Sequence, residues 1–162
     1  MRQSPVRLRA PKPGDLGWVV QAHGALYARE YGFDQSFEGL VAGIVAGYVK
    51  HRDPARERCW IAVKGGMNVG AVFCVKQSPT VAKLRLLILD PAARGHGVGK
   101  RLVGACIRFA RRAGYRKLVL WTQGNLLAAR GIYRAAGFAL VAAEPNRAFG
   151  QDLVSETWEL KL

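Results

Sequence analysis

Acidic residues are scarce in this sequence, whose 162 residues include 11 Asp and Glu but 25 Lys and Arg, for a formal net charge of +14. The shortage is concentrated from Pro91 to Ala143, where there are ten Lys or Arg and no acidic residue. Positive charge of this density attracts polyanions. The sequence therefore favours a nucleic acid or a small phosphate-rich cofactor as a ligand. The alternative is that the arginines simply lie on solvent-exposed faces and bind nothing.

Cysteines and long apolar runs are also few. Cys59, Cys74 and Cys106 are odd in number, form no CxxC pair and have no histidine at metal-ligand spacing. We therefore expect free thiols in a reducing compartment and no bound metal. No apolar run reaches the ~18 residues of a membrane span, and the N-terminal segment has no hydrophobic signal-peptide core. These absences predict a soluble, cytoplasmic protein with no membrane partner.

Length and composition indicate one domain, expected to span residues 1–162. Hydrophobic residues make up 50% of the chain, which is enough for a core without disulfide bridges, and the chain is too short for two full domains. Residues 1–14 carry three prolines and four basic residues. This segment is expected to be a loose basic arm with one short strand near residues 6–9.

Helical periodicity predicts four helices. Asp15 is expected to cap the first, because its side chain can accept hydrogen bonds from free backbone N–H groups. The strongest pattern follows a glycine-rich segment, with apolar residues on one side and Lys and Arg on the other, and Gly114 is expected to end it. The four predicted ranges are about 16–30, 37–51, 98–113 and 126–136.

Runs rich in β-branched and aromatic residues predict strands between these helices. The run from Leu86 to Leu89 is continuously apolar, which predicts a central strand covered on both faces. Residues 65–68 are typical of a hairpin turn. The order of elements indicates an α/β (α+β mixed) protein with one mixed sheet and helices on both sides. The expected strands are 60–63, 69–76, 82–89, 117–122, 139–143 and 153–162.

A glycine-rich segment from Asp90 to Lys100 joins the apolar strand to the basic helix. The first turn of a helix has unpaired N–H groups and a partial positive charge, and glycines let a large anion approach the backbone. Two common phosphate loops do not fit, because Arg101 follows where a Walker loop has Ser or Thr, and because the glycines alternate instead of following GxGxxG. The segment still predicts a phosphate site.

The RGHGVG sequence at residues 94–99 resembles the [QR]-x-x-G-x-[GA] pyrophosphate loop of GCN5-related N-acetyltransferases (GNAT), which holds coenzyme A. The strand and Asp-Pro before it, the basic helix after it and the YRAAGF sequence at residues 133–138 also match this family. The similar region covers about residues 83–141.

A narrower resemblance is carried by GDLGW at residues 14–18, YRKLVLWTQ at 115–123 and DLVSETWEL at 152–160. These segments resemble the acetyltransferase half of bacterial proteins that fuse a MarR-type DNA-binding domain to a GNAT domain. No winged-helix domain precedes them here, so a stand-alone version is expected.

The GNAT resemblance implies a fold, a reaction and a set of cofactor contacts. The fold is a mostly antiparallel twisted sheet of about six to seven strands, in which the strand ending at Leu89 carries a bulge and splays from residues 118–122 to admit coenzyme A. The reaction is direct transfer of an acetyl group from acetyl-CoA to a primary amine. Backbone groups would pair with the pantetheine arm as an added strand does. The implied cofactor contacts are Leu87, Ile88, Leu89, Arg94, Gly95, His96, Gly97, Val98, Gly99, Lys100, Asn125 and Tyr133.

Tyr133 is the general acid that the resemblance implies, since a phenol is un-ionised at neutral pH and can protonate the departing thiolate. From periodicity alone, this residue also fits an aromatic that packs under the sheet. Many family members carry an asparagine seven residues earlier, where this chain has Leu126, and Asn125 lies eight earlier. A step of eight residues lands ~80° away on a helix. Asn125 therefore either contacts the cofactor or caps the helix.

The resemblance does not assign the general base. Family members often carry a glutamate near the start of the cofactor-binding strand, and the matching position resembles Lys83, which cannot act as a base unless its pKa is greatly lowered. The candidates are Glu30, Glu144, His23 or a chain of waters. His23 has a suitable intrinsic pKa, although a lone histidine on a half-apolar helix also fits a structural role. His96 is expected to contact phosphate or solvent.

The amine acceptor is expected to bind between the first two helices and the loop that joins the last two strands. Glu30 could attract a cationic amine, while each residue of this wall also fits ordinary packing or solvent exposure. The expected wall consists of Tyr27, Glu30, Tyr31, Phe33, Asn146 and Phe149.

Three functions follow from these observations. The first is an N-acetyltransferase with a small-molecule or peptide amine as acceptor, and the second is a non-catalytic acyl-CoA sensor. The third is a nucleic-acid-binding module that uses the basic face of residues 100–117, although the sequence has no helix-turn-helix, zinc or RNP signature. Because the last strands of such folds often pair across a dimer, a homodimer is also possible.

Overall fold

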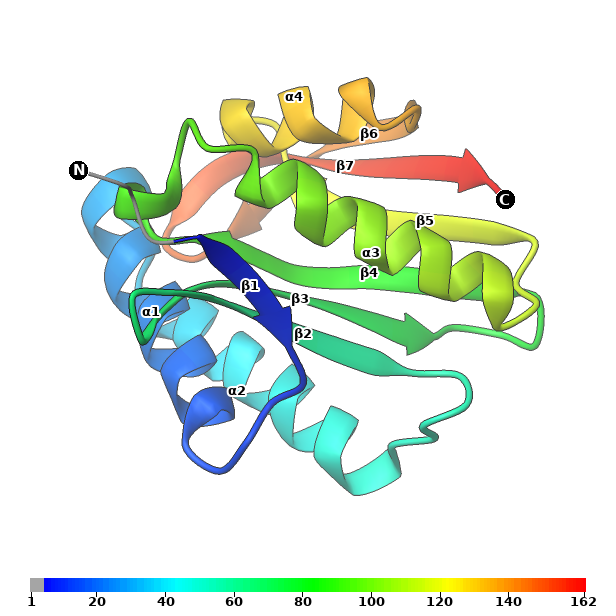
Figure 1. Cartoon of the computed structure of the whole chain (residues 1–162). Coiled ribbons are helices and arrows are strands. Elements are labelled where there is room, and N and C mark those ends of the chain that lie inside the picture. The colour runs from blue at the N-terminus through cyan, green and yellow to red at the C-terminus, as the bar shows by residue number, and fades with distance from the viewer. Residues whose placement is uncertain (1–4) are drawn as a thin grey trace.

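The computed structural model describes residues 5–162, which form one mixed sheet flanked by helices (Figure 1). Within these residues the strand order is β1-β2-β3-β4-β5-β7-β6. β4 and β5 run parallel, and all other neighbours are antiparallel. The strands are β1 (Val6–Arg9), β2 (Arg58–Lys64), β3 (Met67–Lys76), β4 (Val81–Leu89), β5 (Lys117–Gln123), β6 (Ala139–Ala148) and β7 (Gln151–Lys161).

The helices and the element order confirm the fold class predicted from the sequence. The strand expected near residues 6–9 is β1, which pairs with β2. Residues 1–4 of that arm lie outside the described residues. The helices are α1 (Asp15–Tyr31), α2 (Gln35–His51), α3 (Val98–Arg112) and α4 (Leu127–Ala135), with a short 3-10 turn, η1 (Pro91–Ala93), before α3.

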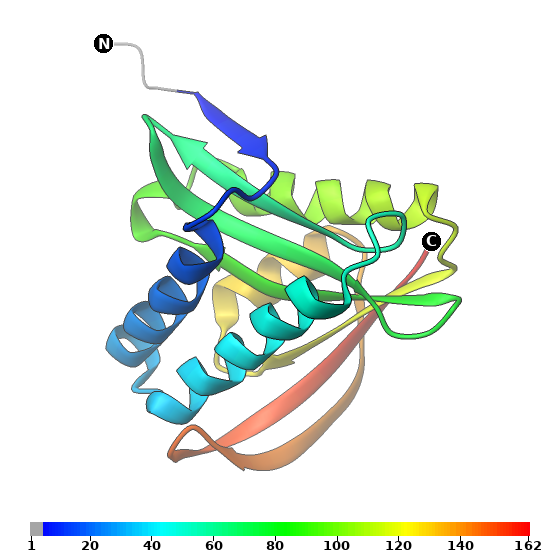
Figure 2. The same cartoon turned by 90° about the horizontal axis from the view of Figure 1, so that it is seen from below.

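Helices cover both faces of the sheet (Figure 2). Successive residues of a strand point to opposite faces, and β3 shows this directly. Phe73 packs into a core with Val19 of α1 and Val41 of α2. Cys74 packs into a second core with Leu102 of α3. The sheet therefore separates an α1–α2 layer from an α3–α4 layer.

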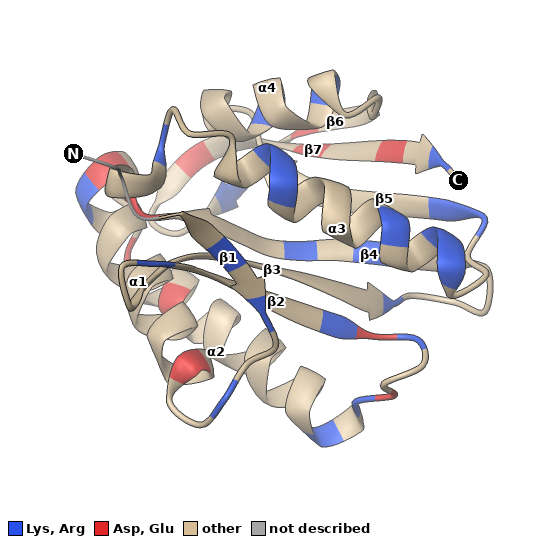
Figure 3. Ribbon diagram, in the orientation of Figure 1, with Lys and Arg blue, Asp and Glu red and all other residues tan. Residues whose placement is uncertain are grey.

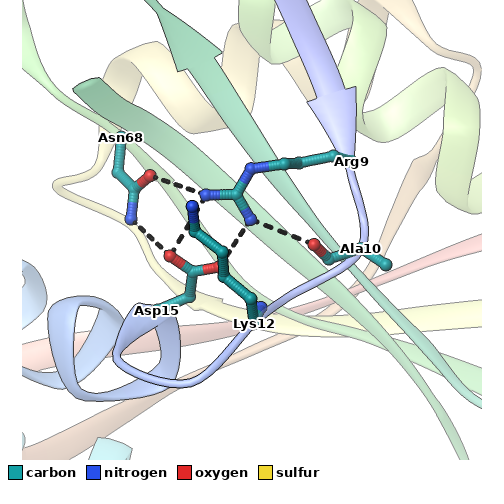
Figure 4. A network of polar contacts seen from close by, with 5 residues as sticks. All are labelled: Arg9, Ala10, Lys12, Asp15 and Asn68. Atoms are coloured by element: carbon teal, nitrogen blue, oxygen red, sulfur yellow. Dashed lines mark hydrogen bonds and ion pairs between the residues drawn. The ribbon is translucent and has the colours of Figure 1, made fainter. Parts of the chain in front are cut away.

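Asp15 does not cap the first helix as predicted. Gly14, with φ 97°, is the N-cap residue, and Asp15 is the first residue of α1 and only 4% exposed. Its carboxylate accepts hydrogen bonds from the Lys12 backbone N–H at 2.7 Å and the Asn68 amide at 3.0 Å, and it pairs with Arg9 (Figure 4). These contacts, led by Arg9, hold the pKa of Asp15 well below its usual value. The carboxylate thus ties β1, α1 and β3 together.

The prediction that residues 86–89 lie in a strand covered on both faces is only partly right. They form the C-terminal part of the central strand β4, but Ile88 alone is buried and the three leucines are half-buried. The parallel pairing of β4 with β5 ends at Lys83 and Val119. The two strands therefore separate beyond this pair, and Leu86 and Leu87 line the gap between them.

A bulge in β4 lies beside this gap. The register between β3 and β4 shifts between Ala71 and Phe73, and Leu86 has φ 55°, in the left-handed region. A bulge of this kind bends its strand and increases the local twist. The bulged and splayed strand that the GNAT resemblance implies is therefore confirmed.

The three cysteines are free and buried, as the sequence predicts. Burial raises the pKa of the Cys59 thiol to about 12 and also raises that of Cys106. Un-ionised, inaccessible thiols are poor nucleophiles, so these two do not suit a covalent acyl intermediate. No helix in the described part of the chain combines the length and the hydropathy that a bilayer crossing needs.

Candidate active site

The glycine-rich segment forms a tight loop between β4 and α3. The Asp90 side chain accepts a hydrogen bond from the Ala92 N–H at 2.9 Å and so begins the η1 turn. Gly97 is the N-cap of α3 and has φ 73°, a conformation that favours glycine. The Arg101 N–H donates to the Gly97 carbonyl at 3.0 Å. The amides ahead of Arg101 in the first turn have no intrahelical acceptor, so this end of α3 can bind an anion.

Gly99 lets the start of α3 lie close to the sheet and to α4. A Cβ atom at this position would lie 2.6 Å from Ile132 Cδ1 and 3.0 Å from Leu89 Cδ1. Both contacts are closer than packed carbon atoms allow. The structure thus gathers the predicted loop residues around one helix end, with Val98 and Gly99 buried and with Arg94, Gly95, His96, Gly97 and Lys100 exposed.

Positive charge continues from the loop along α3 (Figure 3). Lys100, Arg108 and Arg111 line a groove of about 620 Å³ between α3 and α4. Neither helix contains an acidic residue. The groove therefore extends the electropositive surface away from the phosphate loop.

Glu30, a candidate base, lies at the phosphate loop. Its carboxylate is 2.8 Å from Nη2 of Arg94, so the ion pair joins the end of α1 to the loop. Glu30 does not line the cavity described below. The carboxylate is thus held by Arg94 at the loop, away from the cavity. Catalysis by Glu30 stays a prediction, which this placement does not favour.

A cavity of about 100 Å³ lies where β4 and β5 separate. The bulge residues Leu86 and Leu87 line it, together with Leu126 and Tyr133 from the α4 region. Asn125 is exposed and outside the lining, and it does not cap α4, whose N-cap residue is Leu126. The cofactor contact implied for Asn125 stays a prediction.

Tyr133 projects from α4 into this cavity. It is 5% exposed, and its ring packs edge-on against Phe138 with centroids 5.9 Å apart. Burial, with smaller contributions from Tyr27 and Cys106, raises the pKa of Tyr133 above its ordinary value. The phenol is therefore un-ionised at neutral pH and can donate a hydrogen bond. Tyr133 both packs under the sheet and faces the gap. The packing role that fits the periodicity and the general-acid role that the resemblance implies are therefore compatible.

Half of the predicted acceptor wall lines the cavity, namely Tyr27, Phe33 and Phe149. Phe37, which the sequence analysis missed, stacks on Tyr27 with ring centroids 4.8 Å apart. α1, α2 and the β6–β7 turn thus bring aromatic side chains together along one side of the cavity. That the amine acceptor binds there stays a prediction. The other predicted members, Glu30, Tyr31 and Asn146, do not line the cavity.

His23 is the one candidate base named from the sequence that lines the cavity. Its Nδ1 donates to the Val19 carbonyl at 2.7 Å, which leaves Nε2 as an acceptor, and Nε2 is buried without a partner among the described residues. Burial lowers the pKa of His23 to about 4, so the ring is neutral at pH 7. Glu144 lies exposed within β6, not after that strand as expected.

Gln123 is a cavity residue that the sequence analysis missed. It is 2% exposed, and both polar atoms of its amide are buried without a partner in residues 5–162. Alternation along β5 places Gln123 on the same face as Trp121, but the sequence does not show which face the cavity occupies. Arg85 was also missed and lines the cavity with Lys83.

Comparison with known proteins identifies the family. The sequence model described as "Acetyltransferase (GNAT) family" matches residues 21–138. That range includes the phosphate loop, the bulged strand and Tyr133. The chain belongs to the GNAT family. The resemblance inferred from the loop and from the YRAAGF motif is therefore confirmed at the level of the family.

GNAT relatives among curated proteins match part of this chain. N-acetyltransferase 8B of Homo sapiens is 37% identical over 84 residues, which cover 49% of this chain and 37% of that protein. Mycothiol acetyltransferase of Saccharomonospora viridis is 33% identical over 116 residues, which cover 72% of this chain and 32% of that protein. The chain thus spans about a third of the length of these relatives.

Solved structures described as acetyltransferases share the fold over nearly the whole chain. The protein yncA from Salmonella typhimurium, solved with its cofactor acetyl-CoA, superposes with a TM-score of 0.80 at 18% identity, covering 98% of this chain and 94% of that one. Spermidine N-acetyltransferase from Vibrio cholerae, in complex with CoA and spermine, has a TM-score of 0.74 at 18% identity, with 96% and 95% covered. At these identities the likeness shows a common fold.

His23 is expected to make the folded protein sensitive to mild acid. Its pKa is about 4 in the folded state, against an ordinary value of 6.5. Between these values the unfolded chain binds more protons, so the free energy of unfolding falls as the pH drops from 6.5 towards 4. From pH 7 to pH 5 this group should account for a loss of about 2 kcal/mol. Urea unfolding at both pH values measures the loss.

The matched control is His23→Gln, because an amide keeps a polar side chain but does not titrate. The loss of unfolding free energy from pH 7 to pH 5 should be smaller in this variant by about 2 kcal/mol. Equal losses in the two proteins would mean that His23 titrates normally and is not buried as described.

Proposed function

We propose that the chain transfers an acetyl group from acetyl-CoA directly to a primary amine. The observation that carries the proposal is the gap between β4 and β5, with the glycine loop at its edge, Tyr133 inside it and an aromatic wall on its far side. Membership of the GNAT family supports it. So do the relatives, which are named as acetyltransferases.

The residues around the gap fit coenzyme A. Beyond Lys83, the β5 side of β4 has no strand partner among the described residues, so its backbone can pair with an amide-bearing arm. The amides that precede Arg101 can bind a pyrophosphate, and the basic α3–α4 groove continues from there. Bound acetyl-CoA would supply the activated acyl group. Cofactor binding here uses mainly backbone groups and Lys and Arg side chains.

The charges of the cavity favour a neutral amine. Its described lining includes the cations Lys83 and Arg85 but no Asp or Glu. A buried ammonium beside two cations is unfavourable, so the amine leaves its proton in solvent when it enters. His23 Nε2 and the Gln123 amide oxygen can then accept hydrogen bonds from the neutral nitrogen. On this proposal the transfer uses no dedicated carboxylate base.

Tyr133 is proposed as the general acid. As the nitrogen bonds to the acyl carbon, the carbon–sulfur bond breaks and the sulfur takes the electron pair. The Tyr133 hydroxyl donates its proton to that sulfur. The phenolate regains a proton that the nitrogen loses, by way of solvent, so that atoms and charges balance.

Calorimetric titration with acetyl-CoA tests the proposal first, with 3′-dephospho-acetyl-CoA and duplex DNA as controls. Micromolar affinity for acetyl-CoA is expected, with weaker binding of the dephospho form because the basic groove loses one phosphate contact. No affinity for acetyl-CoA, together with salt-sensitive binding of DNA, would overturn it. A transfer assay on an amine panel then separates an enzyme from an acyl-CoA sensor, which would bind without turnover.

We further propose that residues 1–162 act as one catalytic domain in a bacterial cytoplasm, akin to the acetyltransferase half of MarR–GNAT fusion proteins. The GDLGW, YRKLVLWTQ and DLVSETWEL segments support this kinship. A homodimer through the outer strand is part of the proposal. Its support is the exposed apolar surface of Leu140, Val141 and Val154 on β6 and β7.

A further inference from the structure

The cavity contains two half-buried cations that lack an anion. Lys83 and Arg85 flank Leu84, which packs into the α3–α4 core, so both lie on the α1–α2 face of β4. Burial lowers the pKa of both groups, and the charge of Arg85 lowers that of Lys83 further. In the described part of the chain neither has an ion-pair partner. Partly desolvated like charges are unfavourable until an anion joins them.

The cations are reached from outside along α2. A groove of about 820 Å³ shares Leu40, Ile44 and Arg85 with the cavity, so Arg85 lies between the two spaces. The groove also contains Asp53 and Glu57. Both carboxylates already accept hydrogen bonds from backbone amides. Lys76 also lines the groove, and a ligand that enters along α2 meets Arg85 at the entrance to the cavity.

The cavity also contains polar atoms that can form hydrogen bonds with the nitrogen of an amine ligand. Nε2 of His23 and both amide atoms of Gln123 are buried without a partner among residues 5–162, on side chains 1% and 2% exposed. A buried polar atom without a hydrogen bond costs free energy. An amine nitrogen can donate to His23 Nε2 and to Gln123 Oε1 and keep its lone pair for the acyl carbon. A bound amine would thus satisfy two of the three atoms.

Apolar and aromatic side chains complete the lining. Phe37 stacks on Tyr27 along the α1–α2 side, and Trp121 of β5 faces the same cavity while 42% exposed. Such surfaces bind the carbon skeleton of a small ligand, while the few polar groups fix its orientation.

We propose that the acceptor is a small amine with a carboxylate on an apolar or aromatic skeleton, as in a hydrophobic amino acid. The nitrogen is held by His23 and Gln123, and the carboxylate by Lys83 and Arg85. This inference rests on the proposed acetyl transfer and specifies its acceptor. It also excludes a polyamine as the preferred acceptor, because two cations and no carboxylate line the cavity.

Acceptor pairs that differ only in the carboxylate test this inference. Phenylalanine is compared with phenylalanine amide and phenethylamine, tryptophan with tryptamine, and spermidine is the polyamine. The wild-type protein should acetylate each amino acid with a kcat/KM about tenfold or more above that of the counterpart that lacks the carboxylate. Lys83→Gln and Arg85→Gln should each lower this ratio of kcat/KM values about tenfold and leave the KM for acetyl-CoA unchanged. Lys50→Gln, an exposed charge on α2, is the matched control and should keep the preference.

A binding measurement separates this inference from the proposed function. N-acetylphenylalanine and its amide are titrated into the protein with coenzyme A present. Carboxylate-dependent binding that Lys83→Gln and Arg85→Gln weaken supports the acceptor class even where no transfer is detected, in which case only the proposed function fails. Transfer without any preference for a carboxylate would overturn the acceptor class and leave acetyl transfer standing. Equal binding of the two compounds would also overturn it.

Discussion

Tyr133→Phe is expected to lower acetyl transfer about 100-fold or more, with the affinity for acetyl-CoA unchanged. The substitution removes one oxygen from a side chain that is 5% exposed and faces the gap between β4 and β5. Phenylalanine keeps the edge-on packing against Phe138. The loss should therefore fall on the proton donated to the departing sulfur. Single-turnover rates and calorimetry separate the chemical step from cofactor binding.

Two further variants control this experiment. Tyr115→Phe makes the same change at a buried tyrosine that bonds to the Arg56 carbonyl at 2.7 Å and does not line the cavity, so its turnover should stay at the wild-type level. Tyr27→Phe removes the second phenol that lines the cavity. If turnover depends on Tyr27 and not on Tyr133, the acid is on α1. If Tyr133→Phe loses acetyl-CoA affinity, the hydroxyl has a structural or binding role.

The phosphate loop could be predicted from the sequence because its requirements are local. A left-handed N-cap at Gly97 and a helix that follows directly are set by neighbouring residues, whereas the close approach at Gly99 involves Ile132 of α4. Tyr133 was found through the YRAAGF motif of the GNAT resemblance, since periodicity alone also fits a packing role. The role of a residue can be predicted from the sequence when it depends on the residues next to it in the chain.

The gap between the strands could not be read from the apolar run itself. Leu86 to Leu89 looks like a doubly covered strand, and only the left-handed φ of Leu86 and the early end of pairing at Lys83 create the opening. The left-handed backbone conformation of a leucine cannot be predicted from the residue type, because that conformation favours glycine. The bulge was expected only because the family resemblance implied it.

Long-range contacts explain the remaining differences. The ion pair of Arg94 with Glu30 joins residues far apart in the chain and places a candidate base at the phosphate loop. His23 and Gln123 meet at the cavity only because α1 and β5 pack around the same gap. Their importance lies in unpaired buried atoms, a property that belongs to the folded molecule and not to the sequence.

Gly97→Glu is expected to lower the affinity for acetyl-CoA about 100-fold or more. Gly97 has φ 73° as the N-cap of α3, so any side chain there strains the loop by about 1–2 kcal/mol. The added carboxylate would also lie beside the amides that are to bind the pyrophosphate, and juxtaposed like charges cost several kcal/mol. Both effects act on cofactor binding, and calorimetric titration with acetyl-CoA measures their sum.

The chain offers a matched control in Gly14→Glu. Gly14 is also a left-handed N-cap, with φ 97°, and an added Cβ would have no atom within 4 Å. It begins α1, whose 17 residues span about 25 Å, so it lies far from the end of α1 where Glu30 meets Arg94. Gly14→Glu should therefore bind acetyl-CoA as the wild-type protein does. Equal losses in both variants would point to general destabilisation, and wild-type affinity in Gly97→Glu would mean that the pyrophosphate is not bound at the start of α3.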